Sequence, residues 1–145
     1  MSKTNYTETD FEEYIETQLL NSGYIKVDFK LYDKSLCLIP SQVIQFIKET
    51  QLKEYNKLKK EYGDEVDIKL LKRISNEIES KGVNQFLRKG ISDRGSHFKL
   101  VYFQPKSGLN PEHLNLYNKN RFIEVRQVHY SKQNEYLSID MGIFI

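Results

Sequence analysis

The spacing of hydrophobic residues changes from a helical period to a strand period about two thirds of the way along the chain. Up to residue 90, apolar positions recur every three or four residues, which is the spacing of one helix face. The pattern predicts five helices: one from Thr9 to about Asn21, one beginning near Ser41, one over Gln51–Tyr62, one between Asp64 and Gly82, and one over Val83–Lys89. Glycines follow the first, third, fourth and fifth of these segments, as is typical of helix ends.

The first predicted helix carries an N-terminal capping signal. Thr9 with Glu12 three residues later matches a capping box, in which the two side chains satisfy free backbone N–H groups. Its apolar residues at helical spacing predict the buried face, which comprises Phe11, Tyr14, Ile15 and Leu19.

The last third of the chain favours strands. Alternating apolar residues predict strands over Phe98–Phe103, Phe122–Tyr130 and Tyr136–Ile145. The polar residues 131–135 form a turn that makes the last two strands a hairpin. The intervening segment Leu109–Asn120 is polar and asparagine-rich, and we interpret it as a bridge.

Together these elements predict an α+β fold in which a helical N-terminal half packs on an antiparallel sheet of about three strands. The length of 145 residues favours a single domain over 1–145. The chain stops on Gly142-Ile143-Phe144-Ile145 without a polar cap, which favours a chain truncated from a longer protein. The alternative is a strand that ends in the centre of the sheet.

Asp140 is the first candidate for chemistry. It interrupts an apolar strand and falls on the opposite face from Leu137, Ile139, Met141 and Ile143. A carboxylate in such a strand is costly to bury unless it is paired or binds a metal. Metal-dependent phosphodiester cleavage uses such carboxylates to hold Mg²⁺. On the strand period alone, an Asp140 that is paired or solvent-exposed explains the pattern better, because one carboxylate makes no metal site.

Basic residues in the middle of the chain are the second candidate. The net charge is only +2, but residues 51–100 carry 12 basic and 8 acidic side chains, whereas residues 1–50 carry 5 and 8. A polyanion is therefore expected to meet the middle of the chain. The segment 87–99 combines glycines with four cations that suit phosphate contacts, namely Arg88, Lys89, Arg94 and Lys99. The alternative is a solvated connection.

The remaining residues limit the function classes. The single cysteine, Cys37, excludes an internal disulfide, fits a reducing cytoplasm and is expected to be a buried small hydrophobe. There is no signal peptide or apolar run of membrane-spanning length. The three histidines have no metal-ligand spacing, and no phosphate-binding glycine motif occurs.

The order and spacing of several short motifs resemble the N-terminal region of the restriction (motor) subunit of type I restriction–modification enzymes. The motifs are Thr7-Glu8, Phe11-Glu12, Gly23-Tyr24, Phe98-Lys99-Leu100, Pro105, Leu109-Asn110, Asn120-Arg121-Phe122, Val125, Arg126-Gln127 and Ser138-Ile139-Asp140-Met141. They span nearly the whole chain. In that family this region opens a nuclease domain of the PD-(D/E)XK type.

The resemblance implies a role for two acidic positions. Asp140 matches the first catalytic Asp of the family, a Mg²⁺ ligand. An acid on the first helix assists the metal site in related nucleases, and Glu12 or Glu8 matches that position. The family's Glu-x-Lys lies on the next strand, past Ile145, so this chain alone is expected to be an inactive front part of a restriction-endonuclease-like core.

The resemblance also implies partners and a second cofactor. The full protein is expected to be a cytoplasmic, ATP-dependent endonuclease that cuts double-stranded DNA and works with modification and specificity subunits. ATP would bind motor domains further along that protein. Two other interpretations of the residues remain: an α/β interaction module that pairs through its last strand, and a nucleic-acid-binding module without chemistry.

Overall fold

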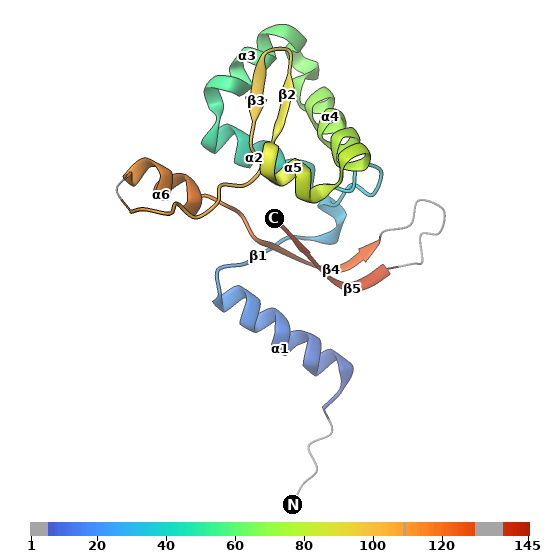
Figure 1. Ribbon diagram of the computed structural model, residues 1–145. Helices are drawn as coiled ribbons and strands as arrows, with labels where there is room; N and C mark the ends of the chain where they lie inside the picture. The colour runs from blue at the N-terminus through green and yellow to red at the C-terminus, as the bar shows by residue number, and fades with distance from the viewer. Residues whose placement is uncertain (1–5, 109, 130–137) are drawn as a thin grey trace, which may run out of the picture. The chain divides into compact units, whose positions relative to one another are not determined.

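The computed structural model describes residues 6–108, 110–129 and 138–145. The chain divides into two units, one formed by Met1–Leu31 with Arg121–Ile145 and the other by Tyr32–Asn120. Helices and short strands occur in both (Figure 1), so the predicted α+β class is confirmed. The restriction-endonuclease-like core remains a prediction.

Helix α1 (Glu8–Asn21) begins two residues earlier than the sequence predicts. Thr7, not Thr9, is the N-cap: its hydroxyl accepts from the backbone N–H of Asp10 at 3.2 Å. The Asp10 carboxylate accepts from the Thr7 N–H at 2.8 Å, which completes the capping box. Extending the helix toward Thr7 costs little conformational free energy, because each residue added to an existing helix gains one backbone hydrogen bond. Glu12 therefore has no capping role.

The predicted buried face of α1 is only half correct. Ile15 and Leu19 are partly buried, but Phe11 and Tyr14 are 63% and 62% exposed. The side of the helix with the two aromatic rings therefore faces solvent.

Gly23 ends α1 as predicted. It has a φ of +93°, and its N–H donates to the carbonyl of Leu20. The N–H of Tyr24 donates to the carbonyl of Leu19, so the pair forms a Schellman motif. The motif turns the chain so that the Tyr24 ring lies 5.7 Å from the ring of Phe122, centroid to centroid.

The first unit contains a three-stranded sheet in the order β1-β4-β5. Its strands are β1 (Ile25–Lys26), β4 (Ile123–His129) and β5 (Ser138–Phe144). The antiparallel pairing of β4 with β5 confirms the two predicted strands, while their turn, 131–135, lies outside the described residues. The sheet is mixed rather than antiparallel, because β1 pairs with β4 in parallel and the expected strand at 98–103 is not part of it.

The buried residues of this unit belong mainly to the central strand. Val27, Ile123, Val125 and Val128 are all at most 7% exposed. The chain between β1 and the second unit includes the short 3₁₀ helix η1 (Phe29–Leu31). In β5, by contrast, Ile139 and Ile143 are 47% and 57% exposed, and Asp140 is also exposed rather than buried.

The helices of the second unit match the predicted segments closely. They are α2 (Pro40–Thr50), α3 (Leu52–Tyr62), the 3₁₀ turn η2 (Gly63–Glu65), α4 (Val66–Lys81) and α5 (Val83–Lys89). Their inward residues form one apolar core together with Ile91 and Phe98. In α4 the buried side follows Val66, Leu70 and Ile74, and Ile68 is 71% exposed.

The strand predicted over Phe98–Phe103 is wrong beyond its first residue. β3 (Ser96–Phe98) pairs antiparallel with β2 (Ile91–Asp93) and ends at Phe98. The amide of Gln51 then bonds both the N–H and the carbonyl of Lys99, at 2.7 and 2.8 Å. The amide of Asn120 does the same for Tyr102, at 2.8 and 2.6 Å. Side-chain amides thus satisfy backbone groups that a neighbouring strand would otherwise pair.

The predicted polar bridge contains a helix, α6 (Pro111–Asn118). Asn110 caps it by accepting from the backbone N–H of Glu112 at 3.0 Å, and Pro111 occupies the first helical position. Asn followed by Pro and Glu is a helix-start signal that sequence reasoning missed.

Two further features concern exposure. Cys37 is exposed, contrary to the prediction, and has a left-handed φ of 55°, whereas the neighbouring Leu38 is buried. Within the described ranges, no helix combines the length and apolar composition that crossing a bilayer requires.

Replacing Gly90 by Ala is expected to destabilise the second unit strongly. Gly90 has φ 68° and ψ −158°, a region accessible essentially only to glycine, and an added Cβ would lie 2.2 Å from the carbonyl oxygen of Phe98. We expect a loss of about 3 kcal/mol or more in the free energy of unfolding, measured by urea denaturation.

The matched control is Gly95→Ala. Gly95 also has a positive φ, 83°, but an added Cβ there meets nothing within 4 Å. That variant is expected to lose only about 1 kcal/mol. Equal losses at the two positions would contradict the close approach at Gly90.

Candidate functional site

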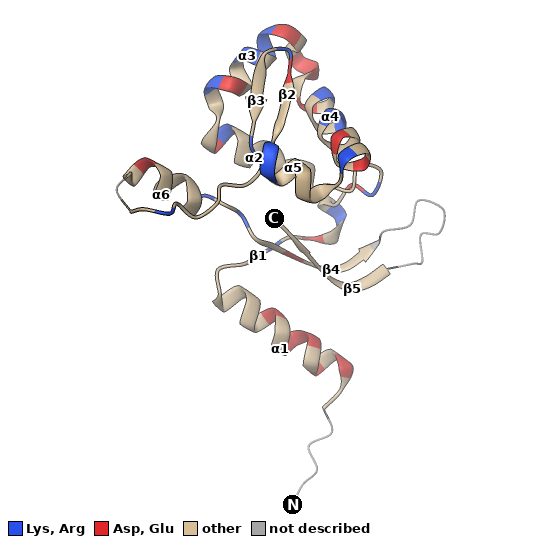
Figure 2. Cartoon of the chain, viewed as in Figure 1, with Lys and Arg blue, Asp and Glu red and all other residues tan. Residues whose placement is uncertain are grey.

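Three glutamates lie on one side of α1 at intervals of four residues. Glu8, Glu12 and Glu16 share this side because four residues correspond to about one helical turn. The side chains of Glu12 and Glu16 are only 17% and 12% exposed. Figure 2 shows acidic positions repeating along α1, which contains no Lys or Arg. The helix therefore needs cations from elsewhere in its unit.

Arg126 of β4 supplies one of these cations. Its guanidinium bonds Glu12 through Nη2 and Glu16 through Nη1, the latter at 2.7 Å. The bond to Glu16, more than any other interaction, raises the pKa of Arg126. Because its side chain is 23% exposed, the pair is partly desolvated and stronger than an ordinary surface ion pair.

Lys26 of β1 supplies the second cation. Its Nζ lies 2.5 Å from Oε1 of Glu16, and this bond is the main reason that the pKa of Glu16 is lowered. Lys26 also pairs in register with Glu124 of β4. Glu124 is fully buried, and neither carboxylate oxygen has a hydrogen-bond partner in the described structure. Burial, followed by the charge of Glu16, raises the pKa of Glu124.

Asp140 of β5 lies beside the other end of the glutamate row. Carboxylate oxygens of Glu8, Glu12 and Asp140 all lie within 4.8 Å of one another. The β4–β5 register pairs Arg126 with Met141 and Val128 with Ile139, so Asp140 stands across from Gln127. Gln127 has a left-handed φ of 57°, an uncommon conformation for a residue other than glycine. The residue with this uncommon backbone conformation therefore lies across from a member of the acidic cluster.

The chemistry of this cluster suits a hard divalent cation. Carboxylate oxygens are the protein ligands that Mg²⁺ and Ca²⁺ prefer, and a cation between three carboxylates would offset their mutual repulsion. Glu12 is shared, because Arg126 also binds it. Glu8 and Asp140 are exposed, which leaves room for water and for a phosphate oxygen to complete a coordination shell.

The two predicted catalytic residues, Asp140 and Glu12, therefore lie together, and Glu8 joins them. Their function as ligands remains a prediction. Sequence reasoning missed Glu16 as a member of this row, the two cations that pair with the row, Lys26 and Arg126, and the buried Glu124. The available signal was the four-residue spacing of acids in a helix without cations, which indicates charged neighbours on the facing strands.

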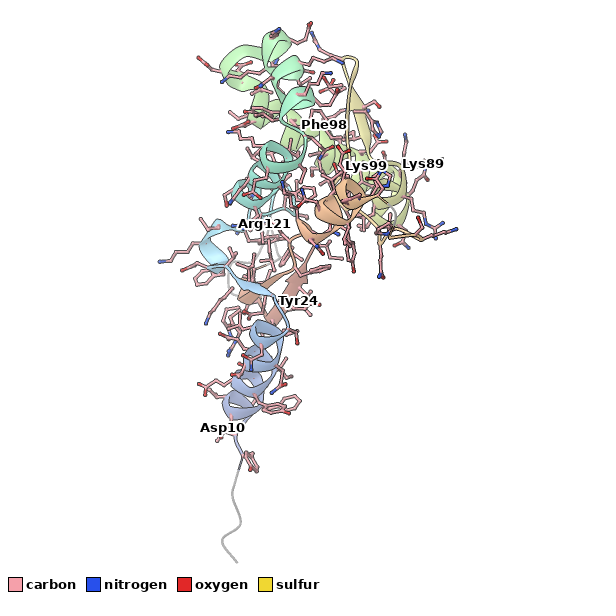
Figure 3. The ribbon with its side chains drawn as sticks, turned by 90° about the vertical axis from the view of Figure 1, so that its left-hand side faces the viewer. Asp10, Tyr24, Lys89, Phe98, Lys99 and Arg121 are labelled. Atoms are coloured by element: carbon pink, nitrogen blue, oxygen red, sulfur yellow. The ribbon has the colours of Figure 1, made fainter. Side chains whose placement is uncertain are left out.

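The four predicted DNA-binding residues all lie in the second unit, and their contacts with DNA remain a prediction. Arg88 and Lys99 line a pocket of about 330 Å³ together with three aromatic or imidazole side chains, Tyr102, Phe103 and His113. Lys89 lines a different cavity, between α4, α5 and the β2–β3 hairpin. Figure 3 shows Lys99 directly after Phe98 at the end of β3 and Lys89 at the end of α5.

Arg94 differs from the other three residues because its guanidinium already has partners within the protein. It lies at the β2–β3 turn, where its guanidinium sits 4.7 Å from the centre of the Tyr62 ring and 3.9 Å from a carboxylate oxygen of Glu61. Stacking on Tyr62 already uses one face of this cation. Arg88 and Lys99 are therefore the stronger candidates for phosphate contact.

Comparison with known proteins adds no relative. No family model, curated protein or solved structure matches the chain.

The buried carboxyl of Glu124 is expected to make stability depend on pH. Because its pKa is raised in the folded protein, the folded state keeps a proton that the unfolded chain releases above its ordinary pKa of 4.5. Its contribution to stability is therefore complete at low pH and falls as the pH rises. Glu124→Gln avoids this loss, so its stability relative to wild type should increase from pH 4 to pH 8.

Thermal melts of both proteins across this pH range measure the difference. Glu13→Gln, at an exposed position of α1, is the control and should show no comparable trend. If Glu124→Gln is destabilised equally at both pH values, Glu124 is ionised and paired in the folded protein, contrary to this account.

Proposed function

We propose that the first unit supplies part of the Mg²⁺ site of a DNA-cleaving nuclease, in the restriction subunit of a type I restriction–modification system. The observation that supports this most directly is the meeting of Asp140 with Glu8 and Glu12. The resemblance assigns a metal ligand to the Asp140 position and an assisting acid to the first helix. These residues are more than 120 positions apart in the sequence, and the fold brings their carboxylates within 4.8 Å.

The protein's own residues would hold the cation and control its charge. Glu8, Glu12 and Asp140 would bind it, and Arg126 would fix Glu12 through their ion pair. A bound Mg²⁺ in a nuclease polarises the scissile phosphate and lowers the pKa of a bound water. Among the described groups at this site, four acidic side chains besides the buried Glu124 (Glu8, Glu12, Glu16 and Asp140) accompany two cations, Lys26 and Arg126. That excess of negative charge favours a divalent cation.

The second unit would contribute to binding double-stranded DNA. Its exposed Arg88 and Lys99 offer charge to the phosphate backbone, independent of sequence. In the complete restriction enzyme, ATP would drive the motor domains, and the modification and specificity subunits would be the partners. Recognition of a DNA sequence would then belong to another subunit.

Divalent-cation binding tests the site directly. Isothermal titration with Mn²⁺ is expected to show one saturable site in the wild-type chain. Asp140→Asn should weaken this binding at least about tenfold, since it removes one charged ligand of three. Glu13→Gln, an exposed acid on the same helix, should bind as wild type does.

A second variant separates a metal site from a purely structural cluster. Arg126→Gln removes the ion pair that positions Glu12, and Mn²⁺ should restore part of the lost stability because it offsets the repulsion between the freed carboxylates. Unchanged cation binding in Asp140→Asn, together with no stabilisation of Arg126→Gln by Mn²⁺, would overturn the proposal.

The four predicted DNA-binding residues are expected to contribute unequally to duplex binding. The double variant Arg88→Glu/Lys99→Glu should weaken duplex binding strongly. It should also reduce the slope of log affinity against log salt by about 2, one unit for each phosphate contact. Arg94→Glu should have a smaller effect, because Tyr62 and Glu61 already engage Arg94.

Fluorescence anisotropy of a labelled duplex at several salt concentrations measures these effects. Lys53→Glu is the matched charge reversal, at an exposed position on α3. A loss for Lys53→Glu as large as that for the double variant would show that only overall charge matters.

A non-catalytic interaction module is the second candidate. The exposed Ile139 and Ile143 on β5, which lies at the end of the strand order, favour it. A sheet edge with apolar side chains can pair with another chain. Concentration-dependent self-association in sedimentation, together with absent Mn²⁺ binding, would favour this candidate over the nuclease.

A further inference from the structure

A cavity of about 240 Å³ lies in the second unit and is lined by residues of α4, α5 and the β2–β3 hairpin. Its polar walls come from seven side chains: Arg73, Glu77, Lys81, Gln85, Lys89, Ser92 and His97. The buried rings and chains of Phe86 and Ile91, each 2% exposed, close its apolar side. This volume is below the roughly 300–1,000 Å³ of most ligand pockets, so a small group fits it best.

Glu77 holds two of the cations in place. Its Oε2 accepts from Arg73 at 2.7 Å, and its Oε1 lies 2.6 Å from Nζ of Lys81. The bond from Lys81, then that from Arg73, lowers the pKa of Glu77, which is only 8% exposed. Each carboxylate oxygen serves a different cation. A guanidinium has five N–H donors and an ammonium three, so both cations keep donors for a ligand.

His97 adds a neutral donor. Its Nδ1 lies 2.8 Å from the hydroxyl oxygen of Ser92. When that hydroxyl donates to Nδ1, the ring proton is on Nε2. A Cβ on Gly90 would lie 3.1 Å from Nε2, so this nitrogen lies over the glycine, which is itself part of the cavity wall.

Lys89 is the third cation that lines the cavity. It is exposed, and Glu77 is the one acidic side chain that lines the cavity in the described part of the chain. Three cations against one carboxylate leave an excess of two positive charges. Phosphate oxygens only accept hydrogen bonds, and they match guanidinium, ammonium and imidazole N–H donors.

We propose that this cavity binds a phosphate group. The group belongs either to a nucleic-acid backbone or to a small phosphorylated molecule, and its chemistry at the cavity is the same in both cases. The residues that line this cavity include none of the acidic cluster in the first unit and neither Arg88 nor Lys99.

The test is a titration of the ¹⁵N-labelled protein with inorganic phosphate, followed by NMR at constant ionic strength with chloride as the reference anion. Shifts are expected in residues of α4, α5 and the hairpin that line the cavity. Lys89→Gln and His97→Gln should each weaken phosphate binding about five- to tenfold. Lys72→Gln, at an exposed position of α4 outside the cavity, should bind as wild type does.

Competition with a short DNA duplex identifies the source of the phosphate. If phosphate displaces the duplex and Lys89→Gln weakens both, the ligand is a backbone phosphate. If phosphate still binds the duplex-bound protein, the ligand is a small phosphorylated molecule. The proposal is overturned if phosphate causes the same shifts as chloride, or if Lys89→Gln binds phosphate as tightly as Lys72→Gln.

Discussion

The first unit depends on Arg126, which binds two successive turns of α1 from the central strand. The guanidinium contacts Glu12 and Glu16, so it fixes both the rotation of the helix and the height at which the helix meets the strand. These three side chains are 12–23% exposed, so loss of Arg126 would leave two poorly solvated carboxylates. Removing one partner of a fully buried pair costs about 3–5 kcal/mol, and partial exposure reduces this cost.

This constraint explains why the acidic side of α1, rather than its aromatic side, faces the strands. Once Arg126 holds Glu12 and Glu16, the four-residue spacing places Glu8 beside Asp140, and Phe11 and Tyr14 remain exposed. Lys26 neutralises the far end of the row through Glu16. The unit is therefore organised by charge pairs, and the one end of the row without a described cation is the end that contains the candidate metal site.

The second unit was more predictable from sequence because hydrophobic burial organises it. Its helices follow the apolar period, and Val83–Lys89 is matched to the residue. The errors occur where side chains replace regular backbone partners. Gln51 and Asn120 pair with the backbone of Lys99 and Tyr102, which removes the expected strand, and no local pattern reveals such distant partners.

At the candidate site, too, some features were predictable from the sequence and others were not. A carboxylate at Asp140 and an acid on the first helix were expected from the resemblance, and both are present in one cluster. The capping box misled the interpretation of Glu12, because Thr7 with Asp10 and Thr9 with Glu12 fit the same motif. Arg126 was unpredictable as their partner, since a strand residue 114 positions from Glu12 meets it only through the fold.

The most direct test of the acidic cluster is a crystal of this chain soaked in Mn²⁺ and measured at the manganese absorption edge. This account predicts one anomalous peak between the carboxylates of Glu8, Glu12 and Asp140, at about 2.0–2.5 Å from their oxygens, the distances typical of hard cations. A saturating soak that gives no peak there, with Glu12 still bound only to Arg126, would contradict it. The cluster would then be a structural charge network without a role in metal-dependent chemistry.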